Sequence, residues 1–318
     1  MNIYFAPLEG VTGSEFRRIH HRFFPGVDAY YMPFVSPTQD HVFTQRELRN
    51  ILPENNQGFR AVPQLLTKNA GDFLWCAGEL AAMGYDEVNF NLGCPSGTVV
   101  AKGKGAGMLA RPEELDRFLD TVFSKAPPIR ISLKTRIGVE RPEEFPRLLE
   151  IFGKYPVSLL IVHPRVRADF YRHPVRMEWF RYGAEHYRGE LCFNGGLVRT
   201  GDCEGFFREY PAVDRVMIGQ GLLANPALAR QVRGGPGPDR ETLRAFHDEL
   251  YHTYLEIFAS QRNTVFHMKE LWSYLSRLFE GAEKPLKRIR KASDSPSYEA
   301  AVSQMFALTL RSEADWSR

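Results

Sequence analysis

The sequence lacks several features that would assign it at once to a class of protein. Its four cysteines, Cys76, Cys94, Cys192 and Cys203, have no short paired spacing, which argues against a zinc site or a disulfide framework. No apolar run approaches the length of a membrane span, and the formal net charge is only +3. The strand–GxGxxG–helix fingerprint and the Walker motif are both missing, which disfavours a Rossmann dinucleotide site. These absences, and an N-terminus that enters a strand directly, predict a cytoplasmic globular protein with no membrane partner.

What the sequence does contain is an alternation of short apolar runs and helical patterns as far as Pro226. The runs are almost continuously hydrophobic, which is typical of parallel strands covered on both faces. Eight strands with crossovers in roughly 225 residues predict a (β/α)8 TIM barrel, and a doubly wound open sheet is the alternative. The expected strands are 3–7, 29–33, 60–66, 87–91, 129–135, 158–163, 190–194 and 215–219, with helices at 14–22, 70–83, 112–125, 142–155 and 202–210.

The pattern changes after the barrel. A Gly/Pro-rich segment, RGGPGPDR at 233–240, cannot continue a helix, and beyond it apolar residues recur at three- and four-residue spacing. Ser295 followed by Pro296 is a good N-cap and first-turn pair for a last helix. We therefore expect a barrel domain at 1–232 and a C-terminal all-helical domain at 241–318.

The segment 89–96, NFNLGCPS, places Asn89, Asn91 and Cys94 where a strand opens into a loop. In a parallel barrel, that end of the strands carries the chemistry. Other strands end in polar or glycine-rich segments too: Pro7-Leu8-Glu9, Gln64, Lys134 and Arg136, His163, Asn194-Gly195-Gly196 and Gly219-Gln220-Gly221. One such residue could be an ordinary loop residue, but their convergence on one barrel face predicts an active site.

The residue types at these ends suggest a flavin mononucleotide (FMN). Glycines after the last two strands fit a phosphate cradle, because backbone N–H groups can then approach an anion closely. An ammonium such as that of Lys134, with His163 nearby, stabilises the negative charge of a reduced flavin. A lone barrel lysine could equally be a Schiff-base nucleophile. Cys94 favours the flavin, because a thiol facing its reactive side is a proton donor for the reduction of a C=C bond.

The motifs APLEGVT, PQLL, NFNLGCPS, LKTRIG, VHPR, FNGG and MIGQGLLANP follow one another along the barrel. In these motifs the chain resembles the tRNA-dihydrouridine synthase family, and APLEG and the tail's LWSYL are most similar to its bacterial C-type branch. The resemblance implies FMN-dependent reduction of uridine in tRNA to 5,6-dihydrouridine, with NADPH as reductant. The alternatives are a flavin barrel that reduces a small molecule, as dihydroorotate dehydrogenases do, a Schiff-base lyase, a non-catalytic RNA-binding module, or a synthase acting on ribosomal RNA.

The resemblance also implies roles for individual residues. Cys94 would protonate uracil C5 while hydride from reduced FMN reaches C6. Asn91 would bind the uracil edge, and Arg136 and Arg165 would lie near the uracil or the flavin phosphate. The flavin would be held by Pro7, Leu8, Glu9, Gln64, Lys134, His163, Asn194, Gly195, Gly196, Gly219 and Gln220.

The chain departs from the family pattern at three positions. Asn89 stands where the family usually has Asp, Pro164 replaces the glycine of VHGR, and Gln220 replaces the arginine of GRG. Pro164 stiffens its turn and removes one N–H, and Gln220 removes a charge. None of the three is Cys94 or Lys134, so the predicted chemistry is unchanged.

Basic residues support RNA binding. Lys284, Lys287, Arg288, Arg290 and Lys291 form a cluster in the tail, and Arg165, Arg167 and Arg172 follow the sixth strand. Such clusters are usually solvated surface, but with the resemblance they predict that Lys287, Arg288 and Arg290 contact tRNA. A base in folded tRNA must be extruded to reach a flavin, and a barrel mouth rimmed by arginines suits that.

Overall fold

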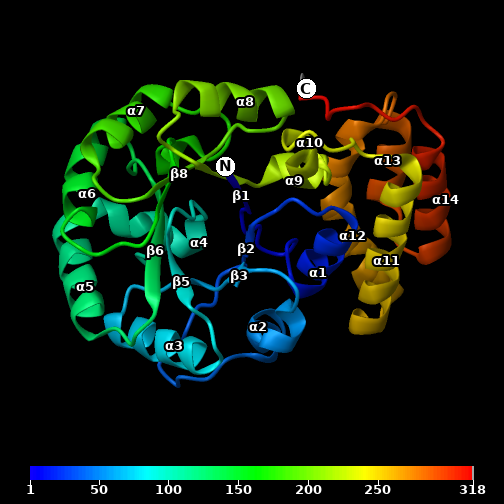
Figure 1. The fold of residues 1–318 in the computed structure, drawn as a ribbon. Helices are drawn as coiled ribbons and strands as arrows, with labels where there is room; N and C mark the ends of the chain where they lie inside the picture. The colour runs from blue at the N-terminus through cyan, green and yellow to red at the C-terminus, as the bar shows by residue number, and fades with distance from the viewer. Residues whose placement is uncertain (317–318) are drawn as a thin grey trace.

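The computed structural model describes residues 1–316 and contains a barrel of parallel strands beside a bundle of helices (Figure 1). The strands are β1 (Asn2–Phe5), β2 (Ala29–Tyr31), β3 (Ala61–Val62), β4 (Gln64–Leu65), β5 (Glu87–Leu92), β6 (Arg130–Arg136), β7 (Leu160–His163), β8 (Leu191–Asn194) and β9 (Arg215–Ile218). They form one sheet in the order β3-β2-β1-β9-β8-β7-β6-β5-β4, and every pairing is parallel. This arrangement confirms the TIM barrel and excludes the open-sheet alternative.

The barrel closes through a strand that a proline divides in two. β3 pairs with β2, where Val62 lies opposite Tyr31, and β4 pairs with β5, where Gln64 lies opposite Asn89. Pro63 lies between the two halves and has no N–H for the ladder, although its carbonyl accepts from the Asn89 N–H at 2.8 Å. β3 and β4 therefore fill the place of the single strand predicted at 60–66.

Helices cover the outside of the barrel (Figure 1). The α-helices are α1 (Ser14–Phe23), α2 (Gln45–Ile51), α3 (Ala70–Ala82), α4 (Gly97–Val100), α5 (Pro112–Lys125), α6 (Phe145–Phe152), α7 (Met177–His186), α8 (Thr200–Glu209), α9 (Gln220–Ala224) and α10 (Leu228–Val232). Short 3-10 turns are η1 (Pro53–Asn56), η2 (Gly105–Ala110), η3 (Pro142–Glu144) and η4 (Arg167–Asp169). The helix predicted at 142–155 is thus a 3-10 turn followed by a shorter α6.

The tail consists of α11 (Arg240–Phe258), α12 (Gln261–Leu275), η5 (Ser276–Leu278), α13 (Glu283–Lys291) and α14 (Ser295–Phe306). The N-cap predicted for the last helix is wrong by one residue. Asp294, not Ser295, is the N-cap, because its carboxylate accepts from the Ser297 N–H at 2.8 Å. Ser295 and Pro296 are the first two residues of the helix itself.

The helical tail packs directly against the barrel helices, α11 on α1 and α12 on α9. Phe246 of α11 meets Phe16 and Phe24 edge-on, with ring centroids 6.0 Å and 5.3 Å apart. The chain after α14 then returns to the barrel, where the Glu313 carboxylate accepts from the N–H and the hydroxyl of Thr200 at 3.0 Å and 2.5 Å (Figure 1). None of the helices within residues 1–316 is long and apolar enough to cross a membrane.

Candidate active site

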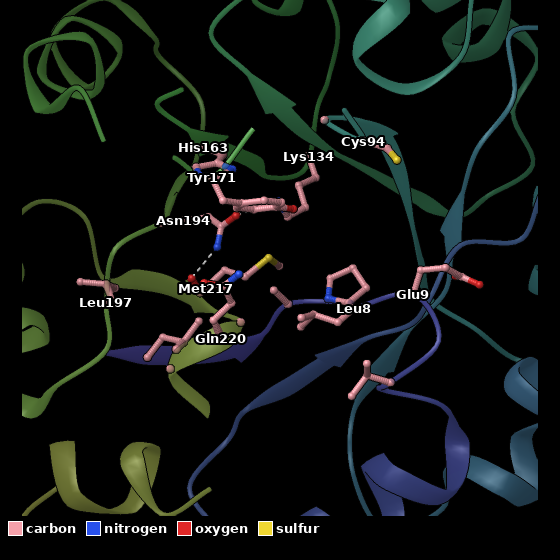
Figure 2. A pocket seen from close by; sticks show the side chains of 18 of the residues that line it. Leu8, Glu9, Cys94, Lys134, His163, Tyr171, Asn194, Leu197, Met217 and Gln220 are labelled. Atoms are coloured by element: carbon pink, nitrogen blue, oxygen red, sulfur yellow. Dashed lines mark hydrogen bonds between the residues drawn. The ribbon is translucent and has the colours of Figure 1, made fainter. Parts of the chain in front are cut away.

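A cavity of about 500 Å³ opens where the barrel strands end (Figure 2). Its size is in the range of cofactor and ligand sites. Every residue predicted to hold a cofactor lines it: Pro7, Leu8, Glu9, Gln64, Lys134, His163, Asn194, Gly195, Gly196, Gly219 and Gln220. Cys94, Asn91 and Arg165 line it as well. The parallel topology brings these residues together, because the carboxyl ends of all the strands meet at one face.

Lys134 on β6 is held by the side-chain amide of Asn194 at the end of β8. Its Nζ donates to Asn194 Oδ1 at 2.7 Å, and Asn194 Nδ2 donates to the Met217 carbonyl at 2.7 Å. Burial lowers the pKa of Lys134 to about 8, and repulsion from Arg136 acts in the same direction. The ammonium is therefore held in place without a counter-charge.

His163 and Arg165 lie near Lys134, and Arg165 adds a second positive charge at this end of the barrel. Arg165 Nη1 is 2.7 Å from His163 Nε2, and because a guanidinium only donates, this nitrogen must accept. Burial, and then repulsion from Arg136 and Lys134, lowers the pKa of His163 well below its usual value. Burial and the charge of Arg136 also lower the pKa of Arg165. An anion bound among these groups would relieve the repulsion.

A tight turn after β5 presents Cys94 to the cavity next to β6, the strand that carries Lys134 (Figure 2). Asn91 Oδ1 accepts from the Gly93 N–H at 3.0 Å and the Cys94 N–H at 2.9 Å, which fixes the turn. The thiol is half-buried, and burial raises its pKa. Cys94 is therefore a neutral thiol at neutral pH and can act as an acid.

Two glycines let loops pass close to these side chains. Gly195 has φ of +130°, and a Cβ there would lie 2.9 Å from His163 Cδ2. Gly105 has φ of +56°, and a Cβ there would lie 3.0 Å from the Cys94 Cβ. Only glycine can adopt the positive φ and also leave room for the neighbouring side chain at each position. The backbone at Gly195 is therefore closely packed against His163, and the backbone at Gly105 against Cys94.

Arg136 lies behind the cavity wall instead of lining it. Its guanidinium is almost fully buried and donates to the carbonyls of Gly93, Val166 and Phe170, each at 2.9 Å. It also lies 5.3 Å from the ring centroid of Tyr171. Arg136 thus ties the Cys94 turn to the loop after β7, and its charge reaches Lys134 and His163 from behind.

The sequence did not reveal several residues that line the cavity. Tyr171 comes from the loop after β7, Glu270 and Tyr274 come from α12, and Trp316 comes from the segment after α14. Tyr274 belongs to the LWSYL segment of the tail, but nothing in that segment indicates that its side chain reaches the barrel, and Tyr171, Glu270 and Trp316 belong to none of the motifs named above. The tail's Lys287, Arg288 and Arg290 lie on α13 with exposed side chains and are not part of the cavity wall.

With the site defined, comparison with known proteins gives its family. The family model for dihydrouridine synthase (Dus) matches residues 4–309. The chain belongs to the dihydrouridine synthase family. The match spans both the barrel and the helices from α11 to α14, so the tail is part of the dihydrouridine synthase pattern.

Curated relatives within the family cover most of the chain. A tRNA-dihydrouridine(16) synthase of Neisseria meningitidis (serogroup A) is 26% identical over 306 residues, which is 92% of this chain and 91% of the relative. A protein of the same name from Ralstonia nicotianae is 30% identical over 236 residues, 72% of each chain.

Solved structures share the barrel of this dihydrouridine synthase family member. Morphinone reductase aligns with a TM-score of 0.53 at 14% identity, over 76% of this chain and 88% of the other. An old yellow enzyme homologue from Zymomonas mobilis aligns with a TM-score of 0.54 at 11% identity, over 76% and 91%. At this identity the likeness establishes the fold alone.

Proposed function

We propose that this protein is an FMN-dependent tRNA-dihydrouridine synthase that reduces a uridine of tRNA in the cytoplasm, with NADPH as reductant. Membership of the dihydrouridine synthase family and the names of the relatives support the reaction class. The observation that carries the proposal is one cavity lined both by the half-buried cations Lys134 and Arg165 and by a neutral thiol, Cys94. The relatives' names suggest position 16 as the target uridine.

The residues present fit a flavin phosphate and an anionic flavin ring. Lys134, His163 and Arg165 all line the cavity, and the pKa of each is lowered first by burial and then by the charge of Arg136. Gly195 and Gly196 line the same end and carry no side chain that would fill it. When bound, reduced FMN supplies the hydride for uracil C6. Lys134 would stabilise its negative charge, and Asn194 would keep the ammonium in place.

The chain's own groups complete the reaction. The Cys94 thiol holds the proton that uracil C5 requires, and Asn91 holds the turn that aims it. Arg136 fixes the same turn from behind through the Gly93 carbonyl. The remaining N–H of Asn91 and the exposed ring of Tyr171 lie at the wall where the base would enter.

We assign RNA binding to the helical domain, residues 241–318, together with the rim of the barrel. Lys287, Arg288 and Arg290 are exposed on α13, and Arg165 lies at the cavity. A free small molecule would not need such a basic helical domain, which favours RNA over a dihydroorotate-like substrate.

The test is the colour of the protein and the content of its tRNA. We expect yellow protein that releases FMN on denaturation, identified by mass spectrometry. Deleting the gene should remove dihydrouridine at position 16 of tRNA, and the wild-type gene should restore it. Colourless protein that borohydride traps with a carbonyl substrate would contradict the proposal and favour a Schiff-base lyase. Loss of dihydrouridine from ribosomal RNA alone would contradict the tRNA assignment.

A further inference from the structure

A line of buried amides runs inward from the Cys94 turn. Asn91 Nδ2 donates to Gln64 Oε1 at 2.7 Å, and Gln64 Nε2 donates to Asn89 Oδ1 at 2.7 Å. Gln64 and Asn89 are completely buried and Asn91 nearly so. Of these three amides, Asn91 and Gln64 line the cavity and Asn89 does not. The line therefore continues beyond the cavity into the interior of the barrel.

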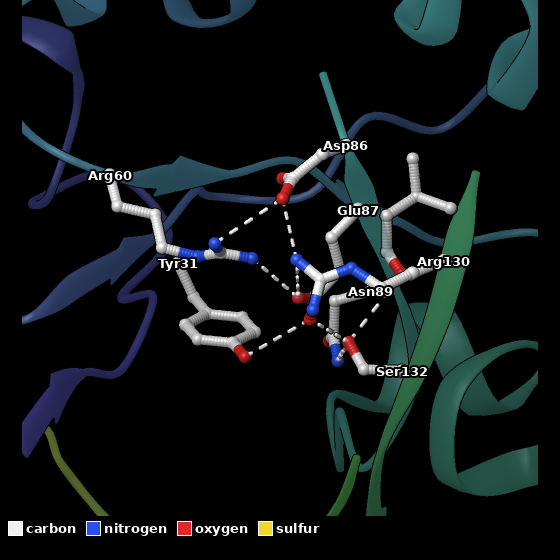
Figure 3. A network of polar contacts seen from close by, with 8 residues as sticks. Tyr31, Arg60, Asp86, Glu87, Asn89, Arg130 and Ser132 are labelled. Atoms are coloured by element: carbon white, nitrogen blue, oxygen red, sulfur yellow. Dashed lines mark hydrogen bonds and ion pairs between the residues drawn. The ribbon is translucent and has the colours of Figure 1, made fainter. Parts of the chain in front are cut away.

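The line ends at a carboxylate on the opposite end of the barrel (Figure 3). Asn89 Nδ2 donates to Ser132 Oγ at 2.9 Å, and the Ser132 hydroxyl donates to Glu87 Oε1 at 2.7 Å. Glu87 lies at the start of β5, where it also accepts from Tyr31 at 3.3 Å and pairs with Arg60 at 2.8 Å.

Every bond in the line donates in the same direction, toward Glu87. The Asn91 oxygen must face the turn, because the Gly93 and Cys94 N–H groups both donate to it. Its NH2 group therefore faces Gln64, and the same reasoning fixes Gln64 and then Asn89. The Ser132 proton remains for Glu87, an acceptor. Flipping any one amide would set two donors or two acceptors against each other in a buried place.

We propose that Glu87 is a positioning residue for Cys94 and acts on its turn through Ser132, Asn89, Gln64 and Asn91. The proposal rests on the proposed function for the role of Cys94 as the acid. Carboxamides are poor proton carriers, so the line transmits orientation and does not supply the proton. Its two ends, a pair of backbone N–H groups and a carboxylate, require the same arrangement of every group between them.

The decisive measurement is the rate at which iodoacetamide alkylates Cys94 in the purified full-length protein, followed by peptide mass spectrometry across a pH series. Burial raises the pKa of this thiol, so a loosened turn should shift the reaction to lower pH and speed it at neutral pH. We expect Glu87→Leu and Ser132→Ala to react about three- to tenfold faster than wild type. Cys76, Cys192 and Cys203 are completely buried, so their alkylation reports global unfolding in the same samples.

Two further variants separate the hydrogen-bonded line from local charge. Glu87→Gln loses the charge, as Glu87→Leu does, but keeps an acceptor for Ser132, so it should stay near wild type. Asp86→Asn removes ion pairs to Arg60 (3.3 Å) and Arg130 (2.5 Å) at the same end of the barrel and lies outside the line. It should also leave Cys94 unchanged.

The proposal is overturned if folded Ser132→Ala protein alkylates as wild type does, or if Glu87→Gln shifts as far as Glu87→Leu. In turnover, Glu87→Leu and Ser132→Ala should slow oxidation of the reduced enzyme by tRNA and leave reduction by NADPH intact. A wild-type protein that never reduces RNA would refute the proposed function, whereas the alkylation series would still decide the role of Glu87.

Discussion

The two ends of the barrel treat charge differently. At the end where the strands begin, Asp86 pairs with Arg130 at 2.5 Å, Glu87 with Arg60 at 2.8 Å, and Glu190 with Arg215. At the end where the strands finish, Lys134 donates to a neutral amide and Arg165 to a neutral imidazole. Opposite charges meet at the first end, whereas Lys134 and Arg165 at the second end have neutral partners, although Asp169 pairs with Arg176 in the loop after β7.

Within this single sheet, the charges at the first end contribute to stability, whereas those at the second end are suited to binding a ligand. Paired charges at the first end stabilise the fold modestly, because most are partly exposed. At the second end, burial and the charge of Arg136 lower the pKa values of Lys134 and His163, and the free protein is destabilised as a result. Such groups are typical of sites where a ligand restores the balance. Substitutions at the two ends should therefore have different readouts.

The largest expected effect is that of Cys94→Ala. The variant should keep FMN and be reduced by NADPH normally, but its oxidation by tRNA should slow about 10²–10⁴-fold, the usual contribution of general acid catalysis. Stopped-flow absorbance of the flavin during mixing with unmodified tRNA measures this rate. Cys203→Ala, on the outer helix α8, is the matched control and should be unaffected. Wild-type oxidation by Cys94→Ala would leave Cys94 a turn residue.

Lys134→Met should come next. Removing a half-buried, charge-assisted hydrogen-bond donor should weaken FMN binding about ten- to a hundredfold and slow flavin reduction. Isothermal titration of the flavin-free protein measures the first effect. Arg215→Met at the other end should change flavin affinity little and lower the free energy of unfolding by about 0–1 kcal/mol. Equal flavin affinity in wild type and Lys134→Met would show that the comparison between the two ends is mistaken.

A pH series sharpens the same point. Lys134 has a folded-state pKa of about 8, below its usual value of 10.5, so it is a cation only below pH 8 in the flavin-free protein. FMN affinity should therefore fall about tenfold between pH 7 and pH 9. The thiols that face Lys134, Cys94 and Cys192, have raised pKa values and stay neutral over most of this range. Lys134→Met should show a flat profile, and a flat profile in wild type would contradict this assignment.

The sign is opposite for the stability of the flavin-free protein. The unfolded chain holds the Lys134 proton up to about pH 10.5, whereas the folded chain releases it near pH 8. The contribution of Lys134 to stability should thus rise with pH from about 8 to 10.5. Urea titrations of wild type and Lys134→Met across this range measure the difference.

The smallest effect is expected from the exposed cations of α13. Replacing Lys287, Arg288 and Arg290 with Gln should weaken tRNA binding and reduce the log–log salt slope by roughly 0.7–0.9 for each phosphate that is no longer neutralised. The equal change of Arg111, Arg117 and Lys125, exposed at or on α5, is the control and should leave the slope unchanged. Reduction by NADPH should be normal in both. An unchanged slope in the α13 variant would show that these charges are only solvated surface.

The sequence located the strand ends because their signals are local. Glycine, proline and polar residues follow apolar runs, and parallel topology gathers those ends at one face without further information. The capping box at Thr44 and Glu47 was also legible and could have revealed α2, which was not predicted. Asp294 was overlooked as a cap because Ser295-Pro296 matches the usual pair one residue later.

Other features depend on residues that only the fold brings together. Arg136 ends β6 like a cavity residue, but its carbonyl partners come from the Cys94 turn and from the loop after β7. The line from Glu87 to Asn91 alternates between β5, β4 and β6 and has no sequence pattern. Non-local pairings of this kind cannot be read from a single sequence.

The cavity wall includes Glu270, Tyr274 and Trp316, which come from the tail and not from the barrel. This shared wall has a consequence for evolution and for protein engineering. These three residues belong to the part of the chain that should choose the RNA, yet they border the place where the chemistry occurs. A chimera that joins this barrel to a relative's tail would therefore import part of another enzyme's active site. Changing the target uridine by exchanging tails should require compensating changes around the flavin, and the two halves should evolve as coupled, not modular, units.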